Sequence, residues 1–159
     1  MPASRMPEPT AISLRRRDVL AAALAGPAAL WVRPASATPE SMRAAIATFT
    51  GGAVPRSGRV KLDSAELVEN GNTVPVTVSV QSPMTEADHV RRIAIFTELN
   101  PEPGVAVFHL SPRNGRAQVV TRMRLATTQQ VLALAQMNDG SLWQAAMEVI
   151  VTLAACVEG

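Results

Sequence analysis

The sequence contains very few of the side chains that most enzymes use at their active sites. Its 159 residues include one cysteine, two histidines and no tyrosine, and only 3% are aromatic. Neither histidine stands at metal-ligand spacing from another histidine or a cysteine, and no nucleophile elbow, phosphate-binding loop or dinucleotide fingerprint occurs. These absences argue against an enzyme in its own right and predict that the chain uses neither a metal nor a cofactor.

The part of the chain that we expect to fold also has no large excess of positive or negative charge. The formal net charge is +2, but the basic surplus lies before residue 38. From Thr38 onward there are ten Lys and Arg against eleven Asp and Glu, a net charge of −1. A nearly neutral body gives no electrostatic basis for binding nucleic acid or an anionic membrane.

Residues 1–37 have the features of a twin-arginine (Tat) export signal. Arg16 and Arg17 are followed by one variable and two apolar residues, and then by an apolar stretch that a glycine and a proline interrupt. This stretch is too short and too broken to span a bilayer stably. Ala35 and Ala37 supply the small residues that a signal peptidase requires, so we expect cleavage after Ala37, a periplasmic location and no membrane anchor. The alternative is a basic N-terminus with a buried apolar segment.

The compartment makes the single cysteine informative. An oxidising periplasm favours disulfides, yet one cysteine cannot form an internal disulfide. A lone cysteine in an exported chain therefore indicates intermolecular pairing or a working thiol. Cys156 is followed by only three residues, and chain ends are usually exposed. Its position argues against the alternative of a buried, inert thiol.

The remaining chain is predicted to begin with one short helix. Thr38 is a suitable N-cap, Pro39 suits the first turn, and Glu40 complements the helix dipole there. An apolar stripe follows at helical spacing, and Gly51-Gly52 is expected to end the helix. We expect this helix to pack against the rest of the domain and to take no part in chemistry.

The pattern then changes to the period of two that is typical of β-strands. Turn signals such as Asn70-Gly71 and Asp139-Gly140 separate the apolar runs. Helix is the alternative for Gln129–Met137 because of its Gln, Leu and Ala content, but its length between turns favours a strand. The spacing predicts an all-β, immunoglobulin-like sandwich of about seven strands, at Val60–Leu62, Val74–Val80, Ile93–Ile95, Val105–Phe108, Val119–Leu125, Val131–Met137 and Trp143–Leu153.

The other polar candidates are weak. His89 lies in an acidic polar stretch and is expected in a loop or at a strand edge, whereas His109 lies in an apolar run and is expected to be a satisfied sheet residue. Four arginines are predicted to lie on solvated strand faces, with a contribution to a protein interface as the alternative: Arg91, Arg92, Arg122 and Arg124.

Several segments, in order along most of the chain after the leader, resemble the SoxY family, the sulfur carriers of the thiosulfate-oxidising Sox system. The segments are Gly51-Gly52, Gly58–Val60, Glu69–Pro75, Ser82–Thr85, Asn100-Pro101, Thr121–Gln129 and Met137–Trp143, followed by the terminal cysteine.

The resemblance implies an immunoglobulin-like sandwich, residues 38–153, and a C-terminal cysteine arm, residues 154–159. It implies pairing with a second small β-sandwich protein, SoxZ. It also implies that Cys156 is the covalent attachment site, which a haem enzyme loads with thiosulfate sulfur before a hydrolase releases sulfate. The chain would be a substrate carrier and not a catalyst.

The arm itself departs from the family pattern, in which glycines flank the cysteine as Gly-Gly-Cys-Gly-Gly. Here Ala154 and Ala155 precede the cysteine, and Val157, Glu158 and Gly159 follow it. Alanine is stiffer than glycine, a β-branched neighbour crowds the thiol, and a carboxylate beside it disfavours the thiolate and repels anionic thiosulfate. A diverged relative that pairs with its partner but loads sulfur weakly is therefore the second hypothesis. A generic periplasmic sandwich with an incidental cysteine is the third.

Overall fold

The computed structural model describes residues 38–153. The predicted export signal, with Arg16, Arg17, Ala35 and Ala37, lies outside the described residues. The predicted arm, residues 154–159 with Cys156, lies outside them as well. Both remain predictions.

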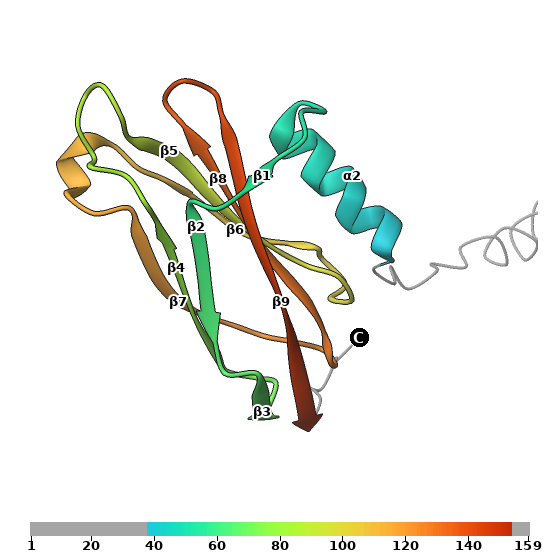
Figure 1. The fold of residues 1–159 in the computed structure, drawn as a ribbon. Helices are drawn as coiled ribbons and strands as arrows, with labels where there is room; N and C mark the ends of the chain where they lie inside the picture. Colours follow the sequence, from blue (N-terminus) through green and yellow to red (C-terminus); the bar gives the residue numbers. More distant parts are fainter. Residues whose placement is uncertain (1–37, 154–159) are drawn as a thin grey trace, which may run out of the picture. The chain divides into compact units, whose positions relative to one another are not determined.

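Residues 38–153 form a β-sandwich with one α-helix, as the sequence pattern predicts (Figure 1). Each of the seven predicted strand regions corresponds to an observed strand, and β1 and β3 are additional short strands. The elements are α2 (Pro39–Thr50), β1 (Arg56–Ser57), β2 (Val60–Ser64), β3 (Leu67–Asn70), β4 (Val74–Val80), β5 (Val90–Thr97), β6 (Gly104–His109), a 3₁₀ turn (Pro112–Asn114), β7 (Gln118–Met123), β8 (Gln129–Met137) and β9 (Leu142–Leu153).

The strands form two sheets that enclose an aliphatic core. The larger sheet has the order β1-β9-β8-β5-β6, with β3 also paired to β9, and the smaller has the order β2-β4-β7. The alternating valines of Val74–Val80 are buried, as a half-buried strand requires, and they pack against inward-facing residues of β5, β8 and β9. No helix among residues 38–153 is long and apolar enough to cross a membrane.

Helix α2 covers the outer face of the larger sheet. The Thr38 hydroxyl accepts a hydrogen bond from the Ser41 backbone N–H, Pro39 occupies the first turn, and Gly51 ends the helix at φ 63°. Met42 is buried in a second apolar cluster against Ala94, Phe96, Leu132 and Leu134 of β5 and β8. These two strands are therefore covered on both faces, and for this reason their sequences are almost continuously apolar.

Pro75 lies in a central strand, a position where proline is uncommon. β4 is the middle strand of the smaller sheet, but its pairing with β2 begins only at Val76, opposite Ser64. Pro75 thus has a neighbouring strand on one side only, β7, at Arg122. The Ser64 hydroxyl of β2 donates a hydrogen bond to the Pro75 carbonyl of β4 at 2.8 Å, which links the two strands at this end of the sheet.

Candidate functional site

Strand β9 leads directly to the predicted cysteine arm and changes partners along its length. From Leu142 to Val149 it pairs antiparallel with β8, which it outlasts. From Ile150 to Leu153 it pairs in parallel with β3. The sequence pattern does not reveal the short strand β3. This strand therefore holds the last part of β9, Ile150 to Leu153, in place.

Hydrogen bonds fix this end of β9 at every residue. The Ile150 N–H donates to the Glu66 carbonyl at 2.8 Å, and the Val151 N–H donates to the Thr128 hydroxyl at 3.0 Å. The Thr152 hydroxyl donates to the Glu69 carbonyl at 3.2 Å, and the Leu153 carbonyl accepts from Gly71 at 2.9 Å. The folded body thus extends to three residues before Cys156, and three residues reach about 10 Å at most.

The base of the arm is apolar and exposed. Leu153 is 68% exposed, Leu67 is 60% exposed and Ile150 is 47% exposed. Leu67 and Ile150 are register partners across the β3–β9 pair, so two of the three side chains are direct neighbours. The alternation of apolar residues predicts that Leu153 faces the core, like Val149 and Val151 on the same face of β9. The core ends at Val149 and Val151, so the Leu153 side chain lies outside it.

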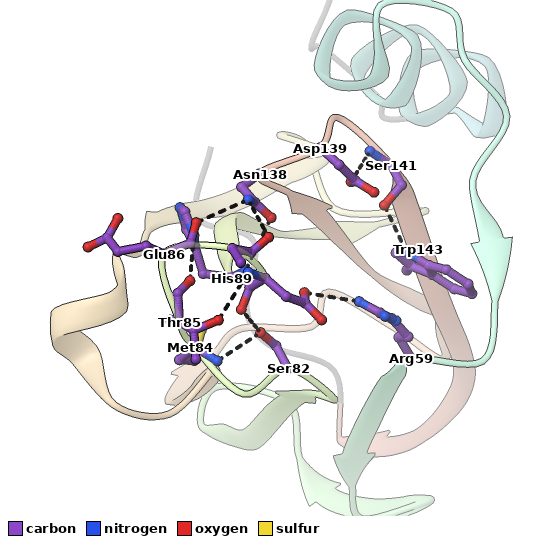
Figure 2. Close-up of polar contacts among 12 residues, drawn as sticks. Arg59, Ser82, Met84, Thr85, Glu86, His89, Asn138, Asp139, Ser141 and Trp143 are labelled. Atoms are coloured by element: carbon purple, nitrogen blue, oxygen red, sulfur yellow. Dashed lines mark hydrogen bonds and ion pairs between the residues drawn. The ribbon is translucent and has the colours of Figure 1, made fainter.

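At the opposite end of β9, the loop Ser82–His89 is held by a dense set of polar contacts (Figure 2). Met84 is buried in the core at φ 55°, a left-handed conformation that is rare for a residue other than glycine. The Ser82 hydroxyl stabilises it by accepting from the Met84 N–H and donating to the Asp88 carbonyl, both at 3.1 Å. This segment is one of those that carry the family resemblance.

Asn138, in the hairpin between β8 and β9, ties this loop to the larger sheet. Its side chain donates to the Ala87 carbonyl at 3.0 Å and accepts from the His89 N–H at 3.2 Å. The Nδ1 atom of His89 lies 3.0 Å from the Thr85 carbonyl, which makes Nδ1 the donor and fixes the ring. The loop prediction for His89 is therefore confirmed, and its ring orientation is defined.

The same hairpin contains a carboxylate with a lowered pKa. Hydrogen bonds from the Ser141 side chain and backbone N–H, the latter at 2.8 Å, hold the pKa of Asp139 below its ordinary value. The Ser141 hydroxyl also accepts from the Trp143 indole at 3.2 Å. Arg56 and Arg59 stack on the Trp143 ring, 5.1 and 5.5 Å from its centre. These contacts order the turn.

A shallow basic depression lies beside the loop, on the outer face of the larger sheet. It has a volume of about 570 Å³ and is lined by His89, Arg91, Arg92, His109, Leu110 and Gln136. Both histidines of the sequence therefore line one depression. Their separation by twenty residues in the sequence gives no sign that they lie close together. Among residues 38–153, no group of three or more His, Cys, Asp and Glu forms a possible metal site.

Two predictions for this region were wrong. His109 lies in a strand as expected, but it is exposed on the edge strand β6, and its side chain has no hydrogen bond among the described residues. Arg92 is half-buried rather than solvated, because its guanidinium stacks on Phe49 of α2, 4.5 Å from the ring centre. Arg122 and Arg124 are exposed, as predicted.

Comparison with known proteins identifies the family. The family model "Sulfur oxidation protein SoxY" matches residues 46–156, and its last matched residue is Cys156. The chain belongs to the SoxY family. It is 34% identical to the solved structure of the sulfur carrier protein SoxY from Chlorobium limicola f thiosulfatophilum, with a TM-score of 0.60 over 70% of this chain and 92% of that chain.

More distant structures share the fold alone. A superoxide reductase (neelaredoxin) from Ignicoccus hospitalis is 22% identical, with a TM-score of 0.53 over 59% of this chain and 80% of that one. A putative superoxide reductase from Thermotoga maritima is 20% identical, with a TM-score of 0.51 over 65% and 89%. No curated protein matches the sequence.

Proposed function

We propose that this SoxY-family chain is a periplasmic sulfur carrier that holds thiosulfate-derived sulfur on Cys156. The observation that carries the proposal is a family match that runs through β9 and ends on the single cysteine. The anchoring of β9 supports it, because a thiol three residues beyond a fixed strand can enter another protein's pocket while its own domain stays folded. The similarity to a solved sulfur carrier also supports it.

The chemistry requires only that the thiol forms and breaks S–S bonds. The Cys156 thiolate and the terminal sulfur of thiosulfate would join in a disulfide bond, and the two electrons released would pass to the haem enzyme of the system. Water would then cleave the outer S–S bond, which releases sulfate and leaves a persulfide on Cys156. Other proteins catalyse both steps, so the chain acts as a carrier and not as an enzyme.

The proposal includes a route and partners. The twin-arginine leader with Arg16 and Arg17 would export the folded domain, and cleavage after Ala37 would free it from the membrane. A SoxZ-like β-sandwich protein would be its stable partner. The haem enzyme and the sulfate-releasing hydrolase would meet the arm transiently.

The intact mass of the mature protein, isolated without reductant from cells that oxidise thiosulfate, tests the carrier role. We expect a sulfur or thiosulfonate adduct that disappears on reduction. A matched Cys156→Ser chain from the same cells should carry none. If the Cys156→Ser chain acquired the same adduct, another residue would hold the sulfur and the proposal would fail.

The second candidate, a diverged SoxY-family subunit that binds its partner but loads weakly, is favoured by the arm sequence. Replacing Ala154, Ala155 and Val157 with glycine restores the family pattern around the cysteine. A large gain in adduct would support weak loading of the native arm. Equal loading before and after the change would support the carrier reading and would show that the stiffer, bulkier arm is no obstacle.

A further inference from the structure

Strand β5 contains a bulge that changes the direction of two consecutive arginines. The β5–β8 register runs from Val90 opposite Met137 directly to Arg92 opposite Gln136, so Arg91 is the extra residue. In a regular strand consecutive side chains point to opposite faces. At a bulge the strand bends and side chains are redirected, and such bulges are frequent beside functional sites. Arg91 and Arg92 accordingly line the same depression.

Arg92 is held in place by neutral groups only. Its Nε donates to the Gln136 side-chain oxygen at 2.8 Å, and Nη2 donates to the Phe49 carbonyl at 3.4 Å. The guanidinium also stacks on the Phe49 ring. These contacts fix the plane of the guanidinium but leave its positive charge without a counter-charge, and Nη1 makes no hydrogen bond within the described part of the chain. A fixed planar guanidinium with free donors is suited to bind an oxyanion.

No carboxylate neutralises the depression. Its lining contains two arginines and two histidines and no acidic side chain. The one ion pair between residues 38 and 153 joins Arg59 to Asp88 at 3.3 Å, so the acidic group next to His89 in sequence already has a cationic partner. Figure 2 shows the Glu86 side chain extending away from His89. The His89 Nδ1–H already donates to the Thr85 carbonyl, so this ring lines the depression and brings no negative charge to it.

From this geometry we propose that the depression binds a small dianionic oxyanion of the sulfate class. The bulged Arg91 and the clamped Arg92 supply paired N–H donors and positive charge, and Gln136 and His109 supply further polar contacts. A dianion matches two guanidinium groups that have no carboxylate partner among the described residues. Sulfate, thiosulfate and hydrogen phosphate share this chemistry.

The site is separate from the predicted cysteine arm and does not rest on the carrier proposal. Gln136 pairs with Leu142, at the start of β9, whereas the arm follows Leu153. Eleven residues of strand separate these positions, a distance of about 36 Å. An anion in the depression is therefore beyond the reach of Cys156 of the same chain, so this site binds an anion that its own thiol does not take up.

Titration of the ¹⁵N-labelled mature protein with sodium sulfate, followed by amide chemical shifts at fixed pH, tests the proposal. We expect saturable shifts at the amides of Arg91, Arg92 and Leu110, and no comparable shifts with sodium chloride at equal ionic strength. Arg91 and His109 are exposed, so Arg91→Gln and His109→Gln should fold normally. Arg91→Gln removes a charged donor and should weaken sulfate binding about tenfold.

Arg122→Gln is the matched control, because Arg122 is an exposed arginine on β7 of the other sheet. It should leave sulfate binding unchanged. Parallel titrations with thiosulfate and phosphate identify the source: preference for the sulfur anions assigns the site to them, and equal binding assigns it to dianionic oxyanions in general. Shifts that rise linearly without saturation, or that weaken equally in Arg91→Gln and Arg122→Gln, would overturn the proposal.

Discussion

The hydroxyl of Thr97 offers a sharp test of how polar groups are accommodated in this core. Thr97 lies at the end of β5 and is fully buried. Its backbone N–H donates to the Pro103 carbonyl at 2.9 Å, but its side-chain oxygen has no hydrogen-bond partner among residues 38–153. Most buried hydroxyls are paired, so this one is a source of instability in the native state.

Thr97→Val should therefore stabilise the protein. An unpaired buried hydroxyl costs about 1–3 kcal/mol, and valine replaces it with a methyl group of nearly the same shape. We expect the free energy of unfolding to rise by about 1–2 kcal/mol, which corresponds to roughly 3–10 °C in Tm for a domain of this size. Urea denaturation should show a higher midpoint with an unchanged slope.

Thr128→Val is the matched control, because the Thr128 hydroxyl is paired. It accepts from the Val151 N–H at 3.0 Å and lies 3.5 Å from the Val151 carbonyl. The same chemical change should here cost about 1–2 kcal/mol, since it leaves a backbone N–H without its partner. Destabilisation by Thr97→Val would refute the reasoning, because it would mean that an internal water satisfies the Thr97 hydroxyl.

Three further predictions concern the sheet end, the helix and the β8–β9 turn. Gln129→Leu removes the acceptor of the Leu99 N–H and the donor to Asn100 and should lower the free energy of unfolding by about 2–4 kcal/mol in urea denaturation. Phe49→Ala removes the ring that contacts Phe96 and Arg92 and should cost about 1.5–3 kcal/mol by the same assay, whereas the exposed Arg43→Ala should stay within about 0.5 kcal/mol. The pKa of Asp139 is lowered by folding, so its contribution to stability is present above the ordinary aspartate pKa and is lost as the pH falls through the lowered value. An NMR titration of the Asp139 carboxyl should shift to higher pH in Ser141→Ala, and an unchanged curve would contradict the assigned cause.

Local signals explain which parts of the fold were predictable from the sequence. The caps at Thr38 and Gly51 and the alternation of Val74–Val80 each depend on residues close in sequence, and the structure confirms all three. Gln129–Met137, for which helix was the alternative, forms a strand as predicted.

Features that depend on distant partners were not predictable in the same way. Strand β3 is short and mostly exposed, and it exists because Leu67 and Val68 pair in parallel with Ile150 and Val151. The basic depression likewise requires the β5–β6 pairing, which sets Arg92 opposite His109, and a bulge that leaves no mark in the sequence. Cys156, the residue on which the proposed function depends, remains a prediction from sequence and family membership.

The change of partner along β9 has a mechanical consequence. A pull on the end of β9 at Leu153 acts along the axis of the strand, and the hydrogen bonds to β8 lie across that axis, while those to β3 are slanted to it. The β8–β9 and β3–β9 hydrogen bonds would then resist the pull in shear, because many bonds are stretched together instead of one after another. If an enzyme drew the predicted arm into its pocket, it would accordingly move the whole domain before it peeled β9 from the sheet.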